Sequence, residues 1–228
     1  MLRAPVVPHP LDEPVIRPDG DDPDLVLIVG NGTAYGWGVT THQLALPGQL
    51  SREMQRITGR PCAVRYIGDP RLEIGSAHEW LGDRDLSAFD AVVVVFGVGD
   101  ALQLTPERQW QASLSRLLDV LRERGKFSAQ FLVIGIQPLR SIITLDSALG
   151  RIAGRHADRL NRVTRSVVDA SDDTGFLPLG PGRFQEGQPY GSAALYRARA
   201  EEMAARLAPI VDSVRAMEGE ARTPARLA

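Results

Sequence analysis

The sequence predicts a doubly wound α/β fold, a three-layer α/β/α sandwich built around a five-stranded parallel sheet. Short apolar runs rich in valine and isoleucine recur at wide spacing. They show little polar alternation, which is typical of strands buried on both faces. Longer segments with apolar residues at three- and four-residue spacing lie between them and are typical of amphipathic helices.

Five strands are expected. The clearest candidates are residues 25–29, 91–96 and 131–136. The stretch "AVRYI" at 63–67 is a weaker fourth candidate. The stretch "GFLPL" at 175–179 is the fifth, and its proline predicts an edge strand or the end of a strand.

Four long helices are expected. They cover residues 44–57, 105–125, 146–170 and 192–217. The second has clear end signals. We expect Thr105 to be its N-cap and Pro106 its first helical residue, and Gly125 to end it.

The length of 228 residues fits one domain with loose ends. Residues 1–23 are rich in proline and acidic residues, and we expect them to form an extension that lies over the surface or moves. Residues 24–217 are expected to form the domain, and residues 218–228 a disordered tail.

Composition excludes several classes of protein. The 26 lysines and arginines against 28 acidic residues give a net charge of −2, so we expect no nucleic-acid or membrane partner. The single cysteine, Cys62, excludes an internal disulfide and is expected to be a buried structural thiol. No apolar signal sequence begins the chain and no apolar run is long enough to cross a bilayer, so a cytoplasmic location is expected.

A glycine-rich loop follows the first predicted strand, where α/β proteins usually build their sites. Its start, Gly30-Asn31-Gly32-Thr33, carries no serine, cysteine or acidic residue. A dinucleotide fingerprint would need its third glycine one position before Gly36, and no P-loop motif is present. Histidines and carboxylates show no metal-ligand spacing. We therefore expect neither a cofactor nor a metal.

These segments give the chain a resemblance to a known family. Gly30-Asn31-Gly32 stands where the SGNH hydrolases, also called GDSL-type esterases and lipases, have Gly-Asp-Ser. The stretch "EIGSA" holds the place of the block whose glycine N–H helps to form the oxyanion hole, and "GVGD" that of Gly-x-Asn-Asp. The stretches "FLVIGIQPL", "ADRLNRVTRSV" and "EGQPYGSAALYRARA" follow in the family's order, so the resemblance covers residues 24–212. It implies a flavodoxin-like sandwich and ester chemistry on acyl or carbohydrate substrates.

The same comparison implies that the catalytic groups are missing. Glycine replaces the nucleophilic serine at Gly32 and the oxyanion asparagine at Gly99, and only the backbone donor at Gly75 is kept. The family's histidine falls on Tyr190 or Pro189, and its acid near Glu186 or Gly187. Glycine cannot form an acyl-enzyme, and loss of an oxyanion donor costs roughly 3–4 kcal/mol of transition-state stabilisation.

No other residue stands out as a replacement. Thr33 and Ser76 are expected to cap local turns or helices, and Ser76 does not face His78 two residues later. For His42 a structural or capping role is favoured over that of a general base. Asp100 is expected to accept backbone N–H bonds and to hold the glycine-rich turn.

Three functions remain open. We favour a non-catalytic domain that binds a small acyl or carbohydrate-like ligand, with Tyr35, Trp37, Trp80 and Tyr190 as possible aromatic walls. Its candidate ligand-binding residues are Gly30, Asn31, Gly32, Thr33, Gly75, Ser76, Gly97, Gly99, Asp100 and Tyr190. The alternatives are an active serine esterase with relocated catalytic residues, and an interaction protein that uses its outer helices. Monomer and homodimer are both left open.

Overall fold

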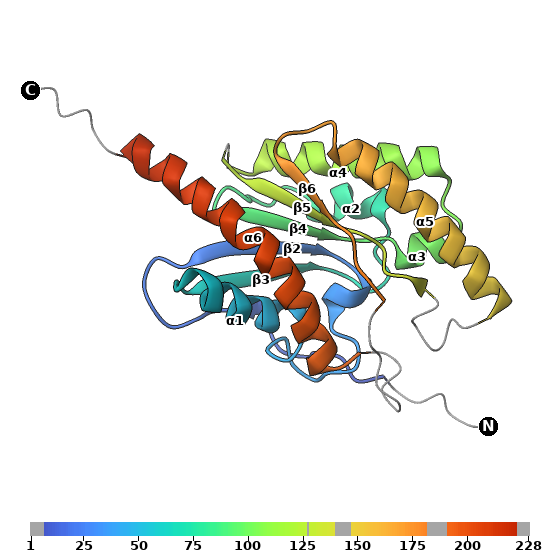
Figure 1. The fold of residues 1–228 in the computed structure, drawn as a ribbon, viewed down its shortest axis with the longest axis horizontal. Coiled ribbons are helices and arrows are strands. Elements are labelled where there is room, and N and C mark those ends of the chain that lie inside the picture. Colours follow the sequence, from blue (N-terminus) through green and yellow to red (C-terminus); the bar gives the residue numbers. More distant parts are fainter. Residues whose placement is uncertain (1–6, 127, 140–146, 182–190, 223–228) are drawn as a thin grey trace, which may run out of the picture.

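The computed structural model describes residues 7–126, 128–139, 147–181 and 191–222. They form one six-stranded sheet of order β1-β3-β2-β4-β5-β6 between two layers of helices (Figure 1). Five strands run parallel, as predicted. These are β2 (Asp24–Gly30), β3 (Cys62–Gly68), β4 (Ala91–Val95), β5 (Gln130–Ile134) and β6 (Thr174–Leu177).

The predicted count of five strands is wrong, because the N-terminal extension supplies a sixth. Strand β1 (Val15–Ile16) pairs antiparallel with β3. The Tyr66 N–H donates to the Pro14 carbonyl at 2.9 Å, and the Ile16 side chain is buried in the core. The extension thus covers an edge of the sheet that would otherwise stay unpaired. A two-residue strand between prolines has no periodicity to detect.

Alternating residues of the central strand face different layers of the sandwich. Val26 and Ile28 of β2 contribute to one buried cluster, and Leu27 and Val29 to the other. The first cluster packs under α1 (Leu46–Thr58) and α6 (Ala193–Arg222). The second packs under α2 (Ile74–Leu81), α3 (Val98–Leu102), α4 (Glu107–Arg124) and α5 (Ala148–Val168). None of these described helices has the length and apolarity needed to cross a bilayer.

Two predicted helix ends need correction. Helix α4 begins at Glu107 with Pro106 as its N-cap residue, one position later than expected. Thr105 belongs instead to the turn after α3, where its N–H donates to the Asp100 carbonyl at 2.9 Å. Helix α6 continues to Arg222, beyond the predicted end at 217. Glu218 in this extra turn lies 2.7 Å from the Lys126 ammonium.

A buried ion network joins the amino ends of the strands to the last helix. Asp24, at the start of β2, is fully buried. Its carboxylate accepts hydrogen bonds from Arg60 Nε at 2.9 Å and from Arg215 Nε at 2.6 Å. Arg60 also binds Asp212, and Arg215 binds Asp22. The planar guanidinium groups of Arg60 and Arg215 therefore compensate the desolvation cost of burying the Asp24 charge.

We predict that Asp24→Ala lowers the free energy of unfolding by about 3–5 kcal/mol, because it leaves two arginines facing a buried gap. Asp212→Ala is the matched control, since the Asp212 side chain is 55% exposed and Arg60 keeps Asp24. The control should cost about 0–1 kcal/mol. Urea unfolding of both variants measures the difference, and equal losses would contradict the assignment of the network as a buried anchor.

Candidate functional site

Three strand ends come unusually close together at the carboxyl edge of the sheet. A Cβ on Gly30, the last residue of β2, would lie 1.9 Å from the Val95 carbonyl oxygen of β4. A Cβ on Gly68, at the end of β3, would lie 1.9 Å from the Gly30 carbonyl oxygen. The Tyr66 hydroxyl donates to that same oxygen at 3.0 Å. Only glycine fits at both strand ends, and the close approach fixes where the next loop starts.

The position of the family's nucleophile lies directly after this approach. Gly32 opens a short 3-10 helix (Gly32–Tyr35) with a left-handed φ of +57°. Apart from its chain neighbours, no atom of the described residues lies within 4 Å of the place where its Cβ would be. The neighbouring Asn31 is bound through its N–H to the Val95 carbonyl and through its side-chain amide to the Leu72 carbonyl. Asn31 thus fixes the loop, while Gly32 presents bare backbone.

A small cavity lies beside Gly32. Its volume is about 10 Å³, which is room for about one water molecule. Small-molecule sites usually measure about 300–1,000 Å³. The lining residues are Asn31, Gly32, Val95, Phe96, Val98, Gly135, Ile136, Gln137 and Leu179. Of the candidate residues that the structure describes, the cavity brings together Asn31 and Gly32.

The loop after β4 carries three further candidates. Gly97 has a left-handed φ of +117°, and a Cβ there would lie 2.5 Å from the Ile136 side chain. Gly99, which the resemblance aligns with the family's oxyanion asparagine, has no described atom within 4 Å of where a Cβ would be. Neither glycine is among the residues that line the cavity. This loop therefore lacks the side-chain donor that the family places here.

Asp100 is buried at the same loop, with 1% of its surface exposed. Burial raises its carboxyl pKa from 3.8 to about 6, although the backbone N–H of Ile74 acts in the opposite direction. One carboxylate oxygen, Oδ2, has no hydrogen-bond partner within the part of the chain that the structure describes. The side chain therefore lies beside the first residue of α2. At neutral pH the carboxyl is mainly ionised, although burial makes that form less stable than it would be in water.

The segment "EIGSA", which the resemblance aligns with the family's oxyanion-hole glycine, lies at the start of α2 and does not line the cavity. Gly75 is the second residue of this helix, and the nearest atom to a Cβ there would be Ser113 Oγ of α4 at 4.0 Å. The expected cap role of Ser76 is wrong, because the N-cap residue is Glu73. The Ser76 hydroxyl instead donates to the Glu73 carbonyl at 3.3 Å. Thr33 lies inside the short helix after Asn31, and Tyr190 lies outside the described residues.

All four histidines of the chain are described, and none lines the cavity. His156 Nε2 lies 2.7 Å from the Thr105 carbonyl oxygen, between α5 and the turn before α4. His78, on α2, has a buried Nδ1 without a partner among the described residues. His9 and His42 belong to the N-terminal contacts. No histidine is therefore placed to take a proton from a nucleophile at Gly32.

The N-terminal extension packs against the glycine-rich loop. The Gly38 N–H donates to the Pro8 carbonyl at 2.8 Å, and the His9 ring stacks on Tyr35 at 5.6 Å. Asp12 accepts the backbone N–H of His42 at 2.9 Å and lies 2.9 Å from His42 Nδ1. Asp12 therefore ties both the backbone and the ring of His42 to the N-terminal extension. Sequence patterns offered no signal for these contacts.

The possible aromatic walls do not form one site. Tyr35 and Trp37 contact each other at 5.0 Å and lie under the N-terminal extension. Trp80, which is 44% exposed, lines a separate hollow of about 540 Å³ with Arg84 and Phe89. The described residues also contain no group of three metal-ligating side chains.

Asn161 on α5 is the family-block residue with the clearest positioning role. Its side-chain oxygen accepts the Ile136 N–H at 2.8 Å, and its amide donates to the Ile136 carbonyl at 2.9 Å. It therefore holds the loop after β5, which lines the cavity through Gly135, Ile136 and Gln137. The sequence named Asn161 only through its block, and gave no sign that Gln137 or Leu179 lines the cavity.

Asp100 makes the stability of the protein depend on pH. Its folded-state pKa exceeds its ordinary value, so between about pH 4 and pH 6 the folded state binds more protons than the unfolded state. The free energy of unfolding should therefore fall as pH rises through this window. We predict that Asp100→Asn removes this loss, and that the variant's advantage over the unaltered protein grows by about 2 kcal/mol between pH 4 and pH 8. Urea unfolding at both pH values tests this, and a constant difference would contradict it.

No family model and no curated protein matches the sequence. Solved structures do match the fold. Est24, a carbohydrate acetylesterase from Sinorhizobium meliloti, is 14% identical with a TM-score of 0.61, covering 82% of this chain and 99% of its own. TesA is 17% identical with a TM-score of 0.62, and an aryl esterase from M. smegmatis is 15% identical with a TM-score of 0.61, both with the same coverage.

These likenesses cover 82% of the chain at 14–17% identity, so they concern the fold alone. They agree with the family resemblance of the sequence blocks. The chain therefore has the fold of the SGNH hydrolases.

Proposed function

We propose that this chain is a non-catalytic domain that keeps the SGNH-hydrolase fold for binding or regulation. The observation that carries the proposal is the bare backbone of Gly32 beside a cavity of about 10 Å³. Ester hydrolysis by this fold needs an oxygen nucleophile, a base and an oxyanion donor at one place. Gly32 cannot supply the nucleophilic oxygen, and Gly99 cannot supply the side-chain oxyanion donor.

The missing base supports the same proposal. A serine restored at position 32 would still need a histidine within hydrogen-bond reach. The four histidines bind or pack elsewhere, and segment 182–190, where the family has its histidine, contains none. A single substitution therefore does not rebuild the reaction.

The ligand class that the resemblance suggests is a small acyl or carbohydrate-like molecule. The open space next to Gly32 and Gly99 is where such a ligand would meet backbone groups. A cavity of about 10 Å³ does not admit it without movement of the surrounding loops. We therefore favour a regulatory role over tight binding of a small molecule.

One observation favours the alternative of a relocated active site. His42 and Asp12 form a histidine–carboxylate pair at 2.9 Å, and such a pair orients the base in serine hydrolases. A serine made nucleophilic by His42 would react with a fluorophosphonate even though Gly32 cannot. The two proposals therefore differ in a direct chemical test.

We predict that the purified protein does not hydrolyse p-nitrophenyl acetate or butyrate above the buffer rate, and that no serine reacts with a fluorophosphonate probe. Gly32→Ser and the double variant Gly32→Ser/Gly99→Asn should also stay inactive, because no base is present. An authentic serine esterase in the same assay serves as the positive control. Hydrolysis that the probe abolishes would overturn the proposal, and its loss in His42→Ala would assign the base to His42.

A further inference from the structure

One exposed face of α5 carries a row of arginines. A helical repeat of 3.6 residues places them along one side. They are Arg151, Arg155, Arg159, Arg162 and Arg165, and all five are exposed. Within the described part of the chain, none of the five takes part in an ion pair, whereas Arg60, Arg122 and Arg215 each hold aspartates. The protein as a whole is slightly acidic, so this charge is local.

The first part of the row departs from the usual pattern of a solvent-facing helix. Such helices pair acids with bases four residues apart, which stabilises them. Arg151, Arg155 and Arg159 instead follow one another at that spacing, so like charges repel. Asp158 and Asp169 stand four residues from Arg162 and Arg165 and offset part of the charge. An anionic partner on this face would relieve the repulsion.

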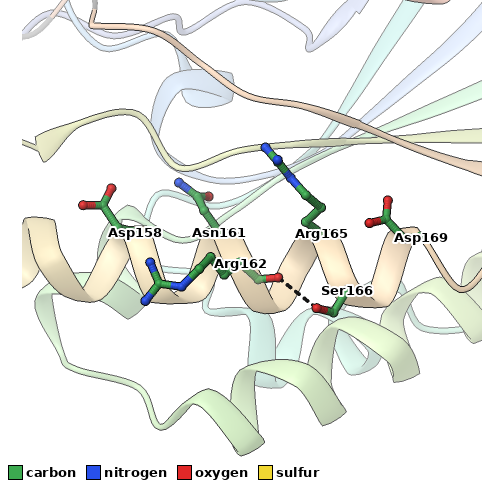
Figure 2. Close-up of a pocket in the computed structure, with 6 residues that line it drawn as sticks. All are labelled: Asp158, Asn161, Arg162, Arg165, Ser166 and Asp169. Carbon is green, nitrogen blue, oxygen red and sulfur yellow. Dashed lines mark hydrogen bonds between the residues drawn. The ribbon is translucent and has the colours of Figure 1, made fainter.

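Two hollows adjoin each other beside the row, and we call them together the trough. The first measures about 450 Å³, and Figure 2 shows Asn161 and Arg165 rising into it from α5. The second measures about 410 Å³ and reaches the edge strand β6 and Arg206 of α6. Arg165 and Asp169 line both hollows. The trough therefore runs from the surface of α5 to the edge of the sheet.

The edge of the sheet in this trough is strand β6. Among the described residues it is the last strand in the sheet order and pairs only with β5. The carbonyls of Asp173 and Leu177 accept N–H groups from β5 and its continuation. Strand alternation then directs the backbone groups of Thr174 and Phe176 outward. Such an edge pairs readily with another extended chain.

We propose that this trough binds an acidic, extended polypeptide segment. The segment would add to the outer edge of β6 at Thr174 and Phe176, and its carboxylates would pair with Arg162, Arg165 and Arg206. Arginine forks match carboxylates with two parallel hydrogen bonds. Addition of a strand to a sheet edge supplies the backbone bonds.

Two features narrow the partner's chemistry. A strand edge offers its N–H and C=O groups in the spacing of another polypeptide, so the edge favours a peptide over a nucleic acid. Asp158 and Asp169 line the same trough and repel a segment with a carboxylate at every position. Because strand side chains alternate between two faces, a segment with alternating acidic and apolar residues fits better. Pro178 limits the available edge at its far end.

The direct test is fluorescence anisotropy with a fluorescein-labelled peptide of alternating glutamate and valine. We expect it to bind more tightly at 50 mM than at 300 mM NaCl, since the pairing is ionic and solvent-accessible. A second peptide with two central valines replaced by proline keeps the charge but cannot donate to the edge. It should bind at least about fivefold more weakly. Absence of binding, or equal binding of both peptides, would overturn the proposal.

A charge-reversal pair locates the site. Arg162→Glu/Arg165→Glu should weaken peptide binding by about tenfold or more, through lost pairing and new repulsion. Arg108→Glu/Arg116→Glu, on exposed positions of α4 outside both hollows, is the matched control and should change it less than about twofold. Thermal unfolding confirms that both variants fold. Equal weakening by the two pairs, or equal competition by a single-stranded oligonucleotide, would contradict a specific peptide trough.

Discussion

The close approach of β2, β3 and β4 around Gly30 is the constraint on which the site depends. With the Val95 carbonyl on one side and Gly68 on the other, no side chain fits where the loop leaves the sheet. The loop must therefore turn at once, and Asn31 is bound to Val95 and Leu72 in the next position. Gly32 consequently lies at the position that the resemblance aligns with the family's nucleophile. The backbone path of this turn is therefore set by the packing of the three strand ends.

The central strands could be predicted because continuous apolar runs are buried on both faces. Strand β1 could not, since Val15 and Ile16 are ordered by pairing with β3 rather than by any local pattern. The start of α4 shifted by one residue because Thr105 bonds back to Asp100 instead of capping the helix. In each case a tertiary contact prevailed over a local signal.

The site was predictable only where adjacent residues stay adjacent in space. Asn31 and Gly32 share the cavity because they share a turn. Gln137 and Leu179 join them from loops far away in the sequence, and no spacing rule brings those loops together. Gly75 belongs to the same family pattern, yet its helix directs it toward α4. The order of the family's sequence segments therefore predicts the path of the backbone, but not which side chains meet at the cavity.

The network around Asp24 has a consequence for synthesis of the chain on the ribosome. Asp24 lies in the first central strand, whereas Arg215 follows it by 191 residues. During vectorial synthesis the strand emerges long before its second cation, so the nascent sheet cannot bury the aspartate with both partners in place. Domains generally complete folding as units. Release of the C-terminal helix from the exit tunnel is therefore the event that lets this domain close.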